Sequence, residues 1–286
     1  MGSFRYFVSQ FSESTKFSTE GLFDDSYTHS SKSAIDDFVD KRTELFQLTL
    51  PYEKTITNLP GELTKMIFLG CISAIESYMR KIIRSIINVD FIANECCEER
   101  TLKYGAVIAH DNINMLPEAL LENISFTSGK NISDAINDFL KVKCEHNRLL
   151  KSVLADYSKI CELRHCVVHR FGLLGSSNAI RLGLSDHARF IEKPIKINFD
   201  KLNNIVHVCN NLVKSVNNHL FSEIIERAYL SNKEIWYSHY AKDRATFKKY
   251  MDIFADSTNP LEYKDVYRDF IKCMHEKHGS NYPTNK

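Results

Sequence analysis

The chain has 286 residues, the size of one large domain or two ordinary ones. It contains 37 lysines and arginines against 36 aspartates and glutamates, so its net charge is +1. This near-neutrality excludes a global positive field for nucleic acid or an anionic membrane, and any such partner must be bound by a local patch. The hydrophobic share of 43% and the charged share of 26% exclude a disordered or fibrous chain.

The residue types that shape turns and disulfides indicate a helical, reduced protein. Ten glycines and six prolines are few for this length, which favours helices over sheets with many tight turns. Eight cysteines have irregular spacing, and a chain this long can build its own core without disulfides. The N-terminus carries no secretion-signal pattern, and the apolar run over 66–75 is shorter than the roughly 20 residues of a membrane-spanning helix. We therefore predict a cytoplasmic protein with no membrane partner.

Helical patterns dominate the first third of the chain. Residues 1–34 predict a loose arm with a short strand or two, and Ser33 is expected to cap a helix over 35–48. The strongest helical pattern covers residues 63–89, with apolar side chains at intervals of three and four. Its first half is apolar nearly all round, which is typical of a central, buried helix.

The rest of the chain predicts more helices and one interruption. Helices are expected over residues 97–109, 115–124, 133–144, 148–171, 200–225 and 233–254, and a polar tail follows the last of them. Residues 176–198 contain the segments NAIRLGL and PIKINF, which predict a small strand pair. The expected fold is all-α, an antiparallel helical bundle over 61–227 with a small β insertion. Residues 1–60 form an N-terminal extension, and residues 228–286 form a C-terminal helix and tail.

Two charged residues interrupt the apolar stripes of the two longest central helices. At 100° per residue, Arg164 falls inside the core stripe that is centred on Ile160. Glu76 falls inside the matching stripe of the earlier helix. A charge in such a stripe is costly unless it is paired, so we expect Glu76 and Arg164 to face each other inside the bundle. The alternative is that each side chain reaches the surface from the edge of its stripe.

A local basic segment lies in the same region. Residues 141–170 hold seven lysines and arginines against three acids, an excess of +4 in a nearly neutral chain. The end of the segment, ELRHCVVHRFG, contains Arg164, His165, His169 and Arg170. Such an excess is the natural place for a phosphate to bind, so Arg170 and Lys159 are candidate RNA-binding residues.

The segment from Arg164 to His169, RHCVVH, resembles the R-x4-6-H motif of the HEPN superfamily, including a polar residue directly after the arginine. The motif ends a long helix before Gly172, and the first long helix reads AIESY around Glu76. The resemblance covers about residues 61–225. It implies a helical bundle that dimerises so that two motifs line one cleft, and a metal-independent endoribonuclease of a toxin–antitoxin or phage-defence system.

The resemblance also assigns roles to residues. In HEPN toxins that are paired with nucleotidyltransferase antitoxins, a tyrosine two positions after the histidine is a modification site. That position is Phe171 here, so this control is not expected. His169 would be the acid or base, Arg164 the phosphate clamp, and His165 and Glu76 supporting residues.

These residue types suit RNA cleavage without a cofactor. The reaction must deprotonate the ribose 2′-hydroxyl, stabilise the crowded phosphate and protonate the leaving oxygen. Histidine can take or give a proton near neutral pH. Arginine presents a fixed set of donors that complements phosphate oxygens and does not lose its charge. The product that the resemblance to the HEPN superfamily implies is a 2′,3′-cyclic phosphate.

The spacing of the motif poses a geometric problem. Five positions on one helix place Arg164 and His169 about 140° apart, so the two side chains do not share a face. The helix could distort or end near His169, the arginine could wrap round it, or a second subunit could complete the site. The expected partners are RNA, a second copy of the chain, and an antitoxin or regulatory protein.

Other interpretations stay open. Cys161, His165 and His169 share a helix face and are possible zinc ligands, although no fourth ligand is suggested, so we expect no metal. The main alternative is a non-catalytic HEPN-like module that binds RNA, a nucleotide or a protein partner. A second alternative is a helical interaction protein in which the motif is a coincidence.

Overall fold

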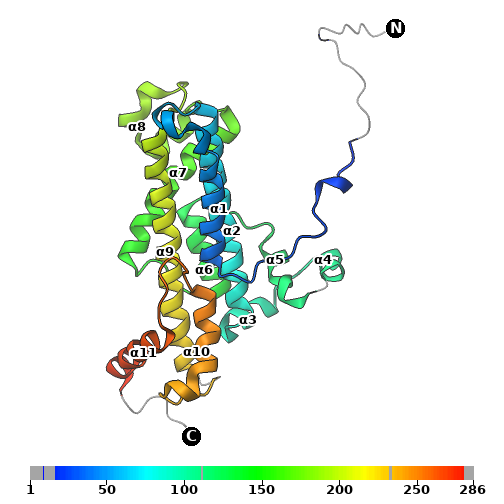
Figure 1. The fold of residues 1–286 in the computed structure, drawn as a ribbon, viewed down its shortest axis with the longest axis vertical. Coiled ribbons are helices and arrows are strands. Elements are labelled where there is room, and N and C mark those ends of the chain that lie inside the picture. The colour runs from blue at the N-terminus through cyan, green and yellow to red at the C-terminus, as the bar shows by residue number, and fades with distance from the viewer. Residues whose placement is uncertain (1–8, 10–16, 111, 232–233, 280–286) are drawn as a thin grey trace. The chain divides into compact units, whose positions relative to one another are not determined.

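A computed structural model describes residue 9 and residues 17–110, 112–231 and 234–279 (Figure 1). The chain divides into two compact units, Met1–Ser31 and Lys32–Lys286. The described part of the first unit contains one 3-10 turn, η1 (Glu20–Leu22), and no buried residue or strand. The remainder of the arm predicted over 1–34 lies outside the described residues.

The second unit is built from helices throughout its described part. In chain order they are α1 (Ala34–Gln47), η2 (Leu50–Asn58), α2 (Gly61–Ile87), α3 (Phe91–Glu98), α4 (Tyr104–Ala109), η3 (Ile113–Met115), α5 (Leu116–Leu121), α6 (Gly129–Leu140), α7 (Arg148–Arg170), α8 (Ser176–His187), η4 (Ala188–Phe190), α9 (Phe199–Leu230), α10 (Tyr240–Phe254) and α11 (Tyr263–His278). The prediction of an all-α fold is confirmed. No described helix is both long enough and apolar enough to span a bilayer.

Helix α2 is the centre of the unit, as its apolar pattern predicted. It packs against α1, α6, α7 and α9, and the long helices run side by side in Figure 1. Its buried side chains include Ile67, Ile75, Met79 and Ile83, which lie on different sides of the helix. Helix α1 also begins where predicted, because the Ser33 hydroxyl accepts a hydrogen bond from the Asp36 N–H.

Helix α7 is held close to α6 by a glycine. A Cβ atom at Gly129 would lie 2.2 Å from the carbonyl oxygen of Leu154, so only glycine fits between the two backbones. The Gly129 N–H donates to the hydroxyl of Ser158, 3.0 Å away. These contacts fix the first half of α7 against the bundle, and its second half carries the motif.

The predicted β insertion at 176–198 is wrong. The segment NAIRLGL belongs to α8, and the described residues contain only one isolated antiparallel bridge, between Leu173 and Pro194. A tertiary contact accounts for the helix, because the Asn178 amide donates to the Glu162 carboxylate at 2.7 Å and docks α8 on α7. Arg181 donates to the same carboxylate at 3.1 Å. The strand propensity of a segment is a local property, so it could not predict a helix that is stabilised by contacts with another helix.

The predicted domain boundaries at residues 60 and 227 do not coincide with a break in the packing of the described helices. Helix α1 packs along α2, and α9 continues without a break to Leu230. The C-terminal part contains two helices instead of one, and α11 occupies the predicted polar tail. Trp236, Phe247 and Phe270 are buried in the same core cluster as α2, so the compact unit runs from Lys32 to the C-terminus.

Candidate functional site

Helix α7 stays regular to its last turn and then ends sharply. Phe171 has a left-handed backbone with φ of 52°, and Gly172 follows with φ of 96°. The Gly172 N–H donates to the Cys166 carbonyl at 3.0 Å, which closes the helix in the manner that the glycine predicted. His169 therefore lies within the regular helix, about 140° round and about 7.5 Å along from Arg164. Distortion of the helix does not bring the two side chains together.

The two motif histidines lie next to each other on the surface. The ring centroids of His165 and His169 are 4.5 Å apart, with the ring planes tilted by 49°. Both side chains are exposed, one helical turn apart. Cys161, one turn earlier on the same face, is buried instead. The exposed pair can therefore reach a ligand or a partner, and Cys161 cannot.

The predicted buried ion pair between Glu76 and Arg164 is wrong. Both residues are half-buried, and no hydrogen bond or ion pair joins them within the described part of the chain. Both act on the thiol of Cys161: burial raises its pKa to about 12, Arg164 opposes the rise and Glu76 adds to it. The two charges therefore both act on Cys161 without forming an ion pair, and their half-exposure agrees with the alternative that each reaches water.

The reason is that one edge of the α7 stripe stays open to solvent among the described residues, although Val167 nearer its centre is buried. Val168 follows Arg164 by one turn and is 46% exposed, although Tyr157 at the start of this stripe is buried. Phe171 is 79% exposed, and Lys65 on α2 places its Nζ 5.2 Å from the centre of the Phe171 ring. We call the following set, which wraps round more than one side of the end of α7 and includes two residues of α2, the motif face: Lys65, Glu76, Arg164, His165, Val168, His169 and Phe171. Lys65, Val168 and Phe171 were not predicted as site residues, although the apolar Val168 between two histidines was a visible signal.

The two predicted RNA-binding residues are held by acidic neighbours. The Nη2 atom of Arg170 lies 2.7 Å from both carboxylate oxygens of Glu192. The Nζ atom of Lys159 lies 2.9 Å from a carboxylate oxygen of Asp156, and this pair is exposed. A phosphate at either cation would therefore have to compete with a carboxylate already in contact.

The zinc alternative finds no support in the arrangement of side chains. In residues 9, 17–110, 112–231 and 234–279, no group of three or more histidines, cysteines, aspartates and glutamates is arranged to hold a metal ion. Burial raises the pKa of the Cys161 thiol, which disfavours the thiolate that zinc requires.

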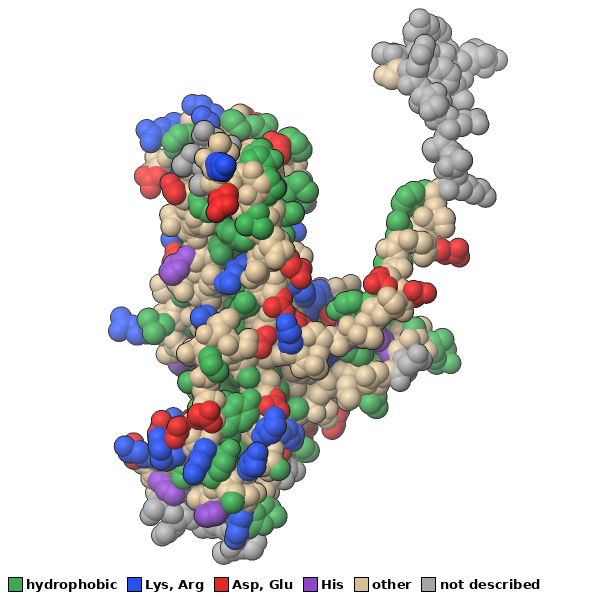
Figure 2. All heavy atoms as spheres, viewed as in Figure 1, with side chains coloured by type: hydrophobic (Ala, Val, Ile, Leu, Met, Phe, Trp, Pro, Cys, Tyr) green, Lys and Arg blue, Asp and Glu red, His purple; other side chains and the backbone are tan. Residues whose placement is uncertain are grey.

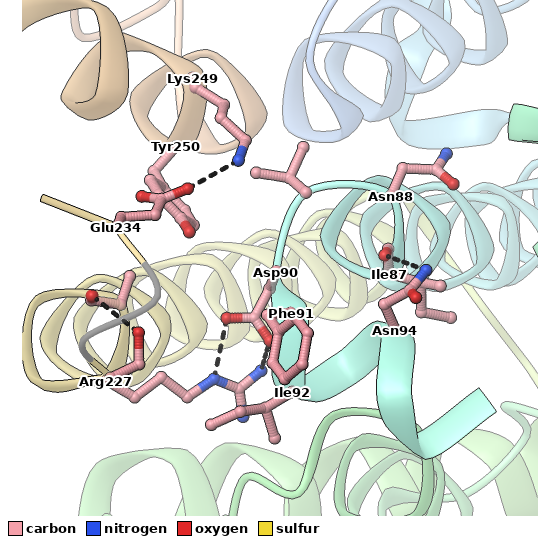
Figure 3. Close-up of a pocket in the computed structure, with 13 residues that line it drawn as sticks. Ile87, Asn88, Asp90, Phe91, Ile92, Asn94, Arg227, Glu234, Lys249 and Tyr250 are labelled. Atoms are coloured by element: carbon pink, nitrogen blue, oxygen red, sulfur yellow. Dashed lines mark hydrogen bonds and ion pairs between the residues drawn. The ribbon is translucent and has the colours of Figure 1, made fainter. Parts of the chain in front are cut away.

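A polar cavity of about 280 Å³ lies at the opposite end of α2, beside α3 and α10 (Figure 3). Its charged residues are already in contact with one another. Arg227 donates from Nε to Asp90 at 3.1 Å, and Lys249 lies 2.8 Å from Glu234. The first pair joins α9 to the loop before α3. The second pair joins α10 to the segment that precedes α10. The cavity therefore offers a ligand fewer available charges than the motif face.

Comparison with known proteins identifies no relative of this chain. No protein-family model matches it, and no curated protein or solved structure is significantly similar. The residues of the motif face therefore carry the functional proposal by themselves.

Proposed function

We propose that this chain is a metal-independent endoribonuclease of the HEPN type, acting as a toxin or phage-defence effector. Two copies associate through their motif faces. Each active site combines Arg164 of one copy with His169 of the other, and RNA is cleaved by attack of its own ribose 2′-hydroxyl.

The observation that carries this proposal is the state of Arg164. The residue is half-buried, and its guanidinium has no hydrogen-bond or ion-pair partner within the described residues. Two other arginines in this region do have ion-pair partners: Arg170 pairs with Glu192, and Arg181 pairs with Glu162. A half-buried cation without a partner is unfavourable, and all its donors remain available for phosphate oxygens.

The apolar members of the motif face support association of two copies. Val168 and Phe171 are exposed beside an arginine and two histidines, a mixture of aromatic, aliphatic and arginine side chains that is typical of protein interfaces. Homodimers usually have two-fold symmetry, so the same face of each copy meets the other. Such an interface can place His169 of one copy opposite Arg164 of the other, which resolves their separation of about 140° on one helix.

The chemistry follows from these groups. A neutral His169 accepts the proton of the 2′-hydroxyl, and the resulting oxygen nucleophile attacks the adjacent phosphorus. Arg164 donates to the non-bridging phosphate oxygens, whose negative charge grows in the transition state. The bond from phosphorus to the 5′-oxygen breaks, water protonates the departing 5′-oxygen, and a 2′,3′-cyclic phosphate remains on the other fragment. DNA has no 2′-hydroxyl and is not cleaved.

His165 and Glu76 have positioning roles in this proposal. The His165 ring lies against the His169 ring and limits the orientations that His169 can take. Glu76 lies on α2 close enough to act on the Cys161 thiol, as Arg164 does with the opposite sign, and its charge moderates the positive charge in this region.

The test is RNA cleavage in the presence of EDTA. The wild-type chain should produce fragments that end in 2′,3′-cyclic phosphate, and Arg164→Ala and His169→Ala should lose at least about 100-fold in rate, the typical contribution of one catalytic group. His146→Ala, which changes an exposed histidine outside the motif face, should cleave normally. Normal cleavage by folded His169→Ala would contradict the proposal. Salt-sensitive RNA binding without any product would favour the non-catalytic binding module instead.

A further inference from the structure

A largely apolar cavity of about 650 Å³ lies between α8 and the side of α7 that carries Leu163 and Cys166. We call it the α8 pocket. Its apolar walls include Leu163, Leu174, Leu182, Phe190, Pro194 and Ile195. The volume and the apolar lining are those of a typical small-molecule site. None of these wall residues belongs to the motif face.

Backbone hydrogen bonds hold the walls of the α8 pocket in place. The Ile195 N–H donates to the Gly172 carbonyl at 2.8 Å, and the Leu174 N–H donates to the Lys193 carbonyl at 3.1 Å. The positive φ of Gly172 suits glycine, and a Cβ atom there would lie 3.1 Å from Ile195. The contact of Arg170 with Glu192 closes the same loop. The pocket is therefore preformed, and a ligand need not order it.

Positive charge gathers at the rim of the α8 pocket. Lys193, Lys196 and Lys201 line it, and their side chains have no ion-pair or hydrogen-bond partner in the part of the chain that the structure describes. The ring of His187 also lines the pocket. Its Nδ1 bonds to the Gly183 carbonyl at 2.8 Å, and this leaves Nε2 for a ligand. Figure 2 shows lysine and arginine side chains beside apolar ones at the end of the molecule that carries α8.

We propose that the α8 pocket binds a small amphipathic anion, with an aliphatic chain in the cavity and a phosphate or carboxylate head at the rim lysines. The walls are mostly aliphatic, and the polar groups gather at the rim, where a charged head keeps access to water. A nucleotide fits less well, because its base edge needs polar partners inside the cavity. Three lysines favour a head with more than one negative charge.

Titration calorimetry with decyl phosphate, below its micellar concentration, tests this proposal on the full chain. Decanoate, decanol, inorganic phosphate and AMP are the comparison compounds. Decyl phosphate should bind best and decanoate should bind more weakly. Decanol, phosphate and AMP each lack either the charged head or the aliphatic chain and should bind at least about tenfold more weakly.

Variants separate the two parts of the site. Lys193→Gln, Lys196→Gln and Lys201→Gln together should weaken decyl phosphate binding about tenfold, and added salt should reduce this difference. Leu182→Trp fills the cavity and should also weaken the binding of decyl phosphate about tenfold. The matched control changes three exposed lysines elsewhere, Lys103→Gln, Lys264→Gln and Lys272→Gln, and should bind like the wild type.

Three results would overturn the proposal. They are no binding of decyl phosphate to the wild type, equal or tighter binding of AMP or inorganic phosphate, and equal affinity of the rim variant and the control variant. The readout is binding of decyl phosphate and not RNA cleavage. A negative binding result therefore does not affect the proposed nuclease function, and a negative cleavage result does not affect the proposed binding of an amphipathic anion.

Discussion

Arg170 at the end of α7 donates from Nη2 to both carboxylate oxygens of Glu192, each 2.7 Å away. If Arg170 also contacts RNA, Glu192 is its competitor. Glu192→Gln should therefore tighten RNA binding about twofold to fivefold in a His169→Ala background, measured at low salt. The unfolding free energy should fall by less than about 1 kcal/mol, because the pair is partly exposed. Unchanged RNA affinity would remove Arg170 from the RNA-binding surface.

Glu76→Gln should change the stability of the fold only slightly. Glu76 forms no ion pair with Arg164 among the described residues, so its loss does not strand a buried cation. The unfolding free energy from urea titration should fall by less than about 1 kcal/mol. A loss of about 3 kcal/mol or more would indicate the buried ion pair after all.

Val168→Lys should disrupt association without unfolding the chain. Val168 is 46% exposed, so the substitution costs the isolated subunit little, but a dimer would bury two additional charges. Sedimentation velocity of the Val168→Lys variant should show a monomer at micromolar concentration, whereas the wild type should be a dimer. Leu149→Lys is the matched control, because Leu149 is 79% exposed on the same helix outside the motif face and its variant should stay dimeric. A wild-type monomer would count against the shared active site.

The buried thiols should make the fold less stable at alkaline pH. Burial raises the pKa of Cys71 to about 11 and that of Cys161 to about 12, from an ordinary value of 9.0. Above pH 9 the unfolded chain loses thiol protons that the folded chain retains, so the unfolding free energy falls as pH rises. Between pH 8 and pH 10 the fall should be up to about 1.4 kcal/mol smaller in Cys161→Ala than in the wild type. An identical fall in both proteins would contradict this assignment.

Periodicity predicted the long helices because their pattern depends on local spacing. The buried centre at α2, the capping of α1 by Ser33 and the end of α7 at Gly172 follow from residues within a few positions of one another. The strand prediction over 176–198 failed because α8 depends on Asn178 reaching Glu162, a contact that local propensity does not contain.

The site was predicted in part. The adjacency of His165 and His169 follows from their spacing of four, whereas the stripe predicted a buried Arg164 and the structure leaves this residue half-buried. The absence of an ion pair between Glu76 and Arg164 could not be predicted, because pairing depends on how α2 packs against that stretch of α7. The contact between Lys65 and Phe171 joins two distant segments, and only the packing of α2 against α7 brings them together.

The most direct measurement is RNA cleavage in EDTA by an equimolar mixture of Arg164→Ala and His169→Ala after subunit exchange, beside the wild type and each variant alone. If each site takes its arginine and histidine from different copies, half of the dimers are mixed and each mixed dimer holds one intact site. The mixture should then recover about a quarter of wild-type activity, although each variant alone is inactive. A mixture as inactive as its components, beside an active wild type, would contradict a site shared between copies, and an inactive wild type would contradict the nuclease itself.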